Sequence, residues 1–349
     1  MTKRLHLWLV ALLSLVSASS GHDLAKLERS FWLNASLAVP KLGYWGTSFA
    51  PPEAPTSTEI TNAARMLIER ANPNRLYLIH HHELPVAETK RIFRDWRKAC
   101  PASVEIVPAL VLKMYDKATT PVFTAAELDE LLTFFKTEIH AERIAVYDVL
   151  PKRDQGAGLH AMAKQFPKGL IRVGLQPDEP LDAPFTAAVE DTWSGFCHGL
   201  TNEDWQDRGF GRDTLRKWVS LRNEQTKPIA YDLIVVAWDY ANTKRGEYPG
   251  YDDAHKNMPL PAGRNRLAVD EILANAKPSV LSGFSADLLI IELNSETPQH
   301  DGNDSFYKTL KAGRNYEGYY AKPWQEVCEA FKAFSSGKKT GTTGESVVK

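Results

Sequence analysis

The clearest indication of the fold is the stretch RLYLIHHHELPVAETKRIFRDWRKACPASVEIVPALVL, residues 75–112. Its two ends, residues 75–82 and 104–112, are short runs rich in Leu, Ile and Val, which is typical of buried strands. Between them, Pro85 opens a segment of helical periodicity that extends to Ala99. A strand, a helix and a second strand in this order predict two parallel strands joined by a crossover helix.

The same alternation continues in both directions along the chain, and eight runs have the character of strands. Eight parallel strands, each followed by a helix, predict an α/β fold that closes into a (β/α)₈ TIM-like barrel. The expected strands are residues 42–47, 75–82, 104–112, 143–150, 170–175, 186–190, 229–238 and 287–293.

The connection between the fifth and sixth expected strands fits the barrel pattern least well. Residues 176–185 are rich in Asp, Glu and Pro and hardly allow a full crossover helix, so we expect an irregular barrel there. If one of the eight runs is not a strand, the alternative is an open, doubly wound sheet.

N-cap residues in the sequence predict where several helices begin. Thr124 and Glu127 form a capping box before a helix over residues 128–139, and Thr58 precedes a helix over residues 60–71. Later helices are expected at residues 158–166, 213–224, 267–276 and 323–334.

Composition limits the classes of function. The chain has 349 residues, with 42 Lys and Arg against 43 Asp and Glu, so no strong field draws it to nucleic acid or to anionic lipid. We expect a single barrel domain over residues 21–334 and a disordered polar tail over residues 335–349.

The first 20 residues have the pattern of a secretory signal peptide. Lys3 and Arg4 precede an apolar run over residues 7–16, and small residues follow at 17–20. The run is about half of the roughly 20 residues that span a bilayer. The pattern predicts a secreted or periplasmic protein that has no membrane association after cleavage.

Cofactor and metal motifs are absent from the sequence. The three cysteines, Cys100, Cys197 and Cys328, are too scattered for a disulfide framework or a thiolate metal site. The chain has no phosphate loop, no dinucleotide-binding glycine motif and no nucleophile elbow. We therefore expect no cofactor.

Aromatic and polar residues follow most of the expected strands. In a (β/α)₈ barrel the functional groups come from the carboxyl ends of the strands. Flat aromatic faces suit the C–H faces of sugar rings, and polar side chains suit hydroxyls, so the set predicts a carbohydrate pocket. The expected substrate-binding residues are Trp45, His80, His82, Lys113, Trp193, Trp238, Asp239 and Asn294.

Acidic residues at these positions suggest a reaction. Glycoside hydrolysis requires two carboxylates that flank the scissile bond, one as acid and the other as nucleophile or base. Asp148, after the fourth expected strand, and Asp191, after the sixth, are the preferred pair. Alternation along the strand keeps Glu190 as a rival of Asp191. Glu292, at the end of the run LLIIE, is a further candidate.

The ending Tyr147–Asp148 of the fourth expected strand, together with an acidic residue at the end of the sixth, resembles the layout of the α-galactosidase and family 31 α-glucosidase barrels. The resemblance implies glycoside hydrolysis, with Asp148 as the nucleophile and Asp191 as the acid/base. The function expected from the sequence is a secreted glycoside hydrolase acting on an oligo- or polysaccharide.

Two alternatives stay open. His80 and His82 share one face of a strand, and this spacing suits a divalent metal, as in metal-dependent barrel hydrolases of the amidohydrolase type. The second pair of histidines in that scheme is missing, and Lys113 and Glu292 fit it only poorly. The other alternative is a barrel that binds carbohydrate without turning it over.

Overall fold

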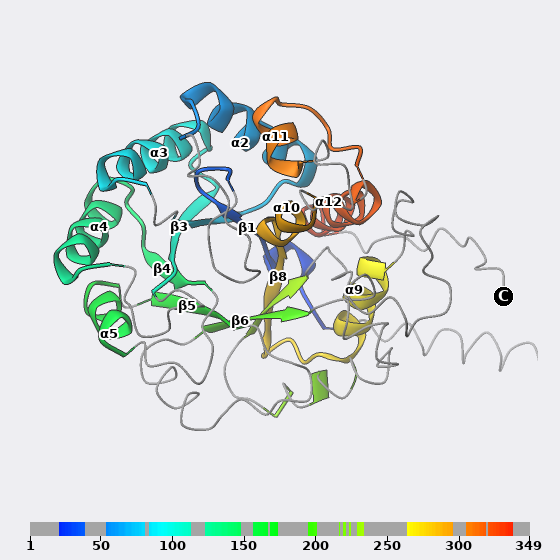
Figure 1. Ribbon diagram of the computed structural model, residues 1–349. Helices are drawn as coiled ribbons and strands as arrows, with labels where there is room; N and C mark the ends of the chain where they lie inside the picture. Colours follow the sequence, from blue (N-terminus) through cyan, green and yellow to red (C-terminus); the bar gives the residue numbers. More distant parts are fainter. Residues whose placement is uncertain are drawn as a thin grey trace, which may run out of the picture.

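The computed structural model describes a little over half of the chain, and it shows a ring of strands with helices outside it (Figure 1). The described residues are 21–38, 54–80, 84–112, 123–147, 156–166, 168–173, 195–200, 216, 219–220, 223–224, 229–233, 264–295, 305–318 and 320–337.

Eight parallel strands form a closed barrel in the order β1-β2-β3-β4-β5-β6-β7-β8. The ring closes between the last strand and the first, where Ser30 lies opposite Ser285 and Trp32 lies opposite Asp287. The α/β barrel expected from the sequence is therefore confirmed. The strands are β1 (Glu28–Asn34), β2 (Arg75–Ile79), β3 (Glu105–Leu110), β4 (Arg143–Val146), β5 (Lys168–Val173), β6 (Gly195–Leu200), β7 (Ile229–Leu233) and β8 (Leu281–Asp287).

Five expected strands are confirmed, one is wrong, and two lie outside the described residues. β2, β3, β4, β5 and β7 begin within two residues of their expected positions. The expected last strand is wrong, because residues 288–295 form a helix and β8 lies just before it. The first and sixth strands are β1 and β6, whereas the segments 42–47 and 186–190 lie outside the described residues.

Most helices of the described chain lie on the outside of the barrel (Figure 1). Their bounds are η1 (Leu24–Lys26), α2 (Ser57–Ala71), α3 (Val86–Ala99), α4 (Ala125–Thr137), α5 (Gly156–Gln165), α9 (Arg264–Asn275), α10 (Leu288–Ser295), α11 (Phe306–Lys311) and α12 (Ala321–Ser335).

Two helices begin with complete capping boxes. The expected box of Thr124 and Glu127 is confirmed at the start of α4. At the start of α2 the cap is Thr56, two residues before the expected Thr58, and Glu59 completes the box. These caps satisfy N–H groups that a helix leaves unpaired in its first turn. None of the described helices is long and apolar enough to span a membrane.

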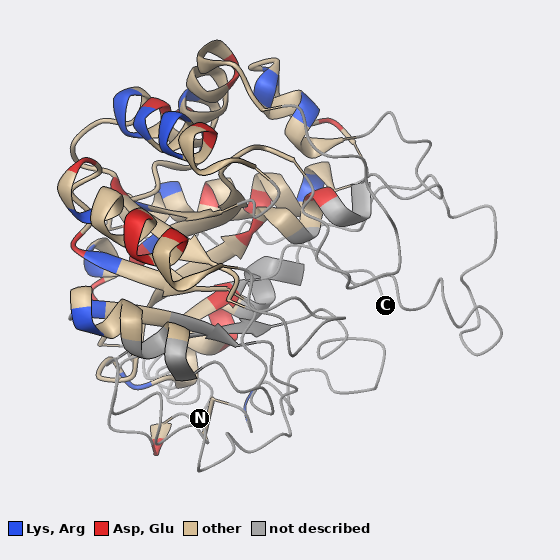
Figure 2. Cartoon of the chain, turned by 60° about the vertical axis from the view of Figure 1, so that its left-hand side comes forward, with Lys and Arg blue, Asp and Glu red and all other residues tan. Residues whose placement is uncertain are grey.

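The outer helices carry interspersed charges of both signs (Figure 2). Two exposed ion pairs, Lys90–Glu130 and Arg94–Glu138, join α3 to its neighbour α4. Exposed pairs of this kind contribute little to stability, so the outer surface is mainly a solvated face.

Strand alternation separates the barrel interior from the layer under the helices. On β1, Phe31 packs against Trp324 and Phe331 of α12, which lies outside the ring. Its neighbours in sequence point the other way: Ser30 hydrogen-bonds Ser285 of β8, and Trp32 stacks on Tyr77 of β2. The residues that fill the barrel are therefore polar as well as aromatic.

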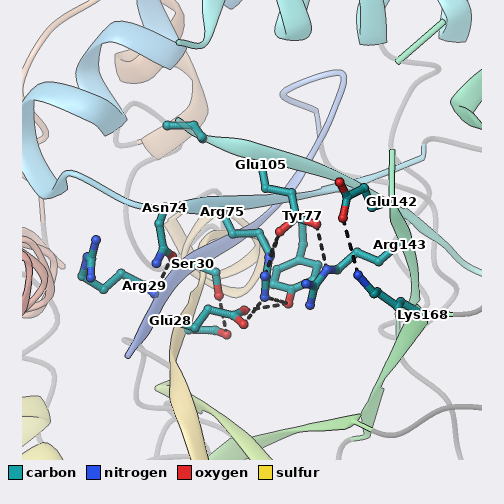
Figure 3. Close-up of polar contacts among 12 residues, drawn as sticks. Glu28, Arg29, Ser30, Asn74, Arg75, Tyr77, Glu105, Glu142, Arg143 and Lys168 are labelled. Atoms are coloured by element: carbon teal, nitrogen blue, oxygen red, sulfur yellow. Dashed lines mark hydrogen bonds and ion pairs between the residues drawn. The ribbon is translucent and has the colours of Figure 1, made fainter. Parts of the chain in front are cut away.

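A network of charged residues occupies the amino end of the barrel (Figure 3). Glu28, Arg75, Glu105 and Arg143 are the first residues of the first four strands, and their signs alternate. Arg75 pairs with Glu28 and, at 2.7 Å, with Glu105, and Arg143 donates to Glu105 at 2.7 Å. Tyr77 donates its hydroxyl to Glu28 at 2.6 Å. The amino end is thus occupied by ion pairs.

Burial lowers the pKa of the Arg75 guanidinium, but its interactions with Tyr77, Glu28 and Glu105 outweigh this effect and raise the pKa above its ordinary value. The charged form is therefore held firmly in the network. Residues at the amino end of a (β/α)₈ barrel usually serve stability, while chemistry takes place at the carboxyl end.

Candidate functional site

A buried hydrogen bond crosses the carboxyl end of the barrel. Tyr147 directly follows β4, and its hydroxyl donates to Oδ2 of Asp287, the last residue of β8, at 2.9 Å. β4 and β8 lie on opposite sides of the eight-stranded ring. Asp287 is fully buried and Tyr147 is nearly so. A carboxylate and a phenol therefore meet inside the barrel, at the end where such barrels place their active sites.

Asp287 also begins the next helix. Its Oδ1 accepts the backbone N–H of Leu289 at 3.1 Å, in the first turn of α10. Each carboxylate oxygen thus has at least one donor, Leu289 N–H on Oδ1 and the Tyr147 hydroxyl on Oδ2. This fixes the orientation of the carboxylate, which is the condition for a precise role in binding or chemistry.

Aromatic rings lie beneath this pair in the barrel. Trp32 and Tyr77 stack with their ring centroids 4.0 Å apart and their planes within 8° of parallel. The ring of Tyr147 lies 5.8 Å from that of Trp32. The rings separate the Tyr147–Asp287 pair from the ion network at the amino end.

Asn34, the last residue of β1, holds the turn that follows it. Its Oδ1 accepts hydrogen bonds from the backbone N–H and the hydroxyl of Ser36, at 2.9 and 2.7 Å. Its own backbone N–H donates to the hydroxyl of Tyr307 at 2.9 Å.

Burial raises the pKa of Tyr307 well above its usual value, and the nearby Glu292 and Asp287 carboxylates raise it further. Tyr307 is thus a neutral phenol near both acids.

Glu292 does not end a strand, because it lies in α10. Its Oε1 accepts the hydroxyl of Ser305 at 2.6 Å, and its Oε2 accepts the backbone N–H of Tyr307 at 2.7 Å. The carboxylate braces the start of α11, where Ser305 is the N-cap. These contacts are structural, and they supply the partners that a carboxylate in so apolar a run requires. Asn294 lies in the same helix.

His80 faces the helix layer. Its Nε2 lies 3.2 Å from the hydroxyl of Thr89 in α3, and its ring lies 5.1 Å from that of Phe123. The prediction that His80 binds substrate in the barrel mouth is corrected here, because the side chain is buried against α3.

The described residues contain no group of three or more His, Cys, Asp or Glu side chains that could hold a metal.

The other expected site residues lie outside the described part of the chain. They are Trp45, His82, Lys113, Asp148, Glu190, Asp191, Trp193, Trp238 and Asp239. Asp148 directly follows Tyr147 and therefore still follows the fourth strand. In the chain, Glu190, Asp191 and Trp193 precede β6.

Sequence reasoning missed the buried acids of the last two strands. Asp287 ends β8, and Asp232 lies on β7 opposite Ser285 of β8; both are fully buried. An Asp that separates the small-residue run SGFSA from the apolar run LLII is a signal for a helix N-cap, and it could have revealed Asp287. Trp32 and Asn34 belong to a strand that was not expected.

The fold and these side chains define a closed (β/α)₈ barrel with a buried polar cluster at its strand carboxyl ends. No family model matches the chain, and no curated protein matches it.

Three solved structures illustrate its similarity to known proteins. The first is N-acetylneuraminate lyase from Mycoplasma synoviae, with 12% identity and a TM-score of 0.42 over 83% of this chain and 81% of that chain. The second is UMP synthase from Leishmania donovani, with 12% identity and a TM-score of 0.39 over 93% of this chain and 56% of that chain. The third is homocysteine methyltransferase from Escherichia coli, with 12% identity and a TM-score of 0.38 over 81% of this chain and 99% of that chain. None of the three is a glycoside hydrolase, and the identities leave function open.

Proposed function

We propose that this chain is a glycoside hydrolase whose active site lies at the carboxyl ends of the barrel strands. The observation that carries the proposal is the hydrogen bond from Tyr147 to Asp287. It holds a buried carboxylate inside the barrel, next in space to the residue that precedes Asp148 in the chain. Carboxylates, amides and aromatic rings are the groups with which proteins bind and cleave sugars.

In this proposal Asp148 is the nucleophile and Asp287 is the second carboxylate. Asp287 takes the role first expected for Asp191, because Asp191 precedes the sixth strand while Asp287 ends the eighth. The Tyr147 hydroxyl orients Asp287. The resemblance to α-galactosidase and α-glucosidase barrels supports the role of Asp148, since it rests on the ending Tyr147–Asp148 of the fourth strand.

The test is turnover by the purified full-length chain on a panel of neutral 4-nitrophenyl glycosides, with reducing-sugar release from polysaccharides as a second assay. At least one substrate should be cleaved. Asp148→Asn and Asp287→Asn should each lower kcat/KM by about 10³-fold, the usual scale for loss of an acid/base or nucleophilic group. The control is Asp129→Asn, on the exposed face of α4, which should keep the wild-type rate.

Other results would redirect the assignment. Full activity in Asp148→Asn would remove that residue from the mechanism. Sugar binding with no turnover on any substrate would favour a carbohydrate-binding barrel without catalysis. Stoichiometric bound metal that is lost in a variant with both His80 and His82 replaced would favour a metal-dependent hydrolase.

We also propose that the protein is secreted or periplasmic. The support is the signal-like pattern of residues 1–20. N-terminal sequencing of the protein recovered from the medium or periplasm should begin near residue 21. An intact N-terminus on protein that stays in the cytoplasm would contradict this localisation.

A further inference from the structure

Two buried donors on β1 have no acceptor among the residues that the structure describes. They are the indole Nε1–H of Trp32 and the amide Nδ2 of Asn34, and both side chains are fully buried. Burying an N–H group without a hydrogen bond costs about 1–3 kcal/mol, so such groups are rare in native proteins. Two of them, two residues apart on one strand, point to an acceptor outside the described residues, and a bound ligand would supply it.

The orientation of the Asn34 amide follows from its partners. The backbone N–H of Ser36 can only donate, and it lies 2.9 Å from the atom assigned as Oδ1. If the amide were flipped, two donors would face each other at this position. The Nδ2 group of Asn34 is therefore the end of the amide that lacks an acceptor.

The Trp32 and Asn34 donors lie close to the carboxylate of Asp287 and the phenol of Tyr147. Trp32 lies opposite Asp287 in the pairing of β1 with β8, and its ring lies beside that of Tyr147. Asn34 is two residues further along β1, so alternation places it on the same interior face. Two N–H donors, a carboxylate and a phenol thus surround one region at the carboxyl end of the barrel.

The charge of this region indicates which kind of ligand could accept hydrogen bonds from Trp32 and Asn34. The buried acids on the neighbouring elements are Asp287, Glu292 and Asp232. Arg29 and Arg75, two largely buried cations of the described chain, both lie at the amino end: Arg29 bonds the backbone carbonyls of Leu27 and Asn72, and Arg75 pairs with Glu28 and Glu105. The carboxylates here disfavour an anion, whereas a hydroxyl accepts from an N–H and donates to a carboxylate.

We propose that Trp32 Nε1–H and Asn34 Nδ2 form a subsite that binds a neutral hydroxyl of a sugar, with the Asp287 carboxylate as the acceptor for that hydroxyl. Because both donors are fully buried, the subsite encloses one hydroxyl and not a whole ring. The inference deepens the proposed function, since it names the part of the substrate that this end of the barrel recognises.

The test is the NMR signal of the Trp32 indole N–H in the full-length protein labelled with ¹⁵N-tryptophan. The chain has nine Trp residues, and Trp32→Phe and Trp96→Phe assign the two signals of interest. The probes are D-glucose, D-galactose, D-mannose and D-xylose, with inorganic phosphate as the anion. The Trp32 signal should move downfield with at least one sugar, because a new acceptor deshields the proton, and it should not move with phosphate.

Trp96 provides the internal control. Its indole N–H is also buried, but it already donates to the backbone oxygen of Ala35 at 2.8 Å. Its signal should stay in place when sugar is added. Equal movement of the Trp32 and Trp96 signals, no movement of Trp32 with any sugar, or movement with phosphate alone would each overturn the proposal.

A variant tests the second donor. Asn34→Asp keeps an oxygen for Ser36 but replaces the Nδ2 donor with a negative oxygen, so the sugar that shifts Trp32 should bind about tenfold more weakly or worse. Asn62→Asp is the matched control, since Asn62 Nδ2 donates to Lys311 on the outer surface, and it should keep the wild-type affinity. An affinity within twofold of wild type in folded Asn34→Asp would overturn the subsite. If that variant does not fold, the Trp32 signal alone decides.

The two proposals fail separately. A shifted Trp32 signal without cleavage of any glycoside would leave the subsite standing and refute the glycoside hydrolase. Cleavage that depends on Asp148, with a Trp32 signal that no sugar moves, would leave the enzyme standing and refute the subsite.

Discussion

The Tyr147 hydroxyl on the carboxyl side of β4 donates a 2.9 Å hydrogen bond to Asp287 at the end of β8. The two strands lie on opposite sides of the ring, so one polar contact ties the barrel together across its interior. The same contact orients the carboxylate that we propose as part of the active site.

The first prediction concerns the strength of this contact. Tyr147→Phe should lower the free energy of unfolding by about 1–3 kcal/mol, because a buried carboxylate loses a donor. In a double-mutant cycle with Asp287→Ala, urea unfolding should give a coupling energy of at least about 1 kcal/mol. Effects that add to within about 0.5 kcal/mol would show that the two groups do not interact.

The ion network at the amino end should be a major source of stability. Arg75→Met leaves Glu28 and Glu105 without their shared cation, and breaking a buried pair on one side typically costs about 3–5 kcal/mol. The matched control is Arg94→Met, which breaks an exposed pair with Glu138 and should cost less than about 1 kcal/mol. Equal losses of unfolding free energy in the two variants would contradict a structural role for the network.

The buried thiols should be inert in the folded protein. Burial raises the pKa of Cys100 to about 12, and it raises the pKa of Cys328 as well. At about pH 8 only about one Cys100 thiol in 10⁴ is the reactive thiolate. Peptide mapping by mass spectrometry after treatment with iodoacetamide should find these two cysteines unmodified in the native protein and modified in urea. Rapid modification in the native state would contradict their burial.

The capping box of α2 should make stability depend on pH. The backbone N–H of Thr56 donates to the Glu59 carboxylate and lowers its pKa, and partial burial works against this. A depressed pKa in the folded state adds stability above the unfolded pKa, and this stability is lost as pH falls through the folded value.

Glu59→Gln should therefore have a lower Tm than wild type at neutral pH, and the difference should be smaller at an acidic pH below the unfolded Glu pKa of about 4.3. Glu69→Gln, at an exposed position of the same helix, sets the background. A deficit of the same size at both pH values would show that the charge of Glu59 is not its cause.

The barrel could be predicted from the sequence because most of its strands are apolar runs between readable helices. The start of β2 was found at Arg75 because Leu, Tyr and Ile follow it, and Pro85 marks the next helix. Hydrophobic patterning was sufficient where a strand contains a run of large apolar residues.

The strands that were misplaced are those that carry polar or small residues. β8, LSGFSAD, holds Gly283 at a point where a Cβ would overlap Glu28 of β1, so close packing excludes the β-branched residues that usually mark a strand. The apolar run that follows it, LLIIE, has the composition of a strand but forms α10, because Asp287 caps a helix there. Short apolar runs do not distinguish the two structures.

Which residues lie at the carboxyl ends could be predicted only where the strand was found. Tyr147 was placed after the fourth strand because β4 was found, whereas Asp287, Trp32 and Asn34 were missed with their strands. His80 was assigned to the wrong face, since alternation along β2 sends it toward Thr89 in α3. Contacts between strands far apart in the chain, such as β4 and β8, leave no periodic signal in the sequence.

A crystal structure of the protein soaked with the neutral monosaccharide that it binds best would show directly whether the barrel binds sugar at the carboxyl ends of its strands. We expect density for the sugar there, with one hydroxyl within hydrogen-bonding distance of Trp32 Nε1 and Asp287. Sugar bound only against the outer helices, or at the amino end beside Arg75, would contradict it.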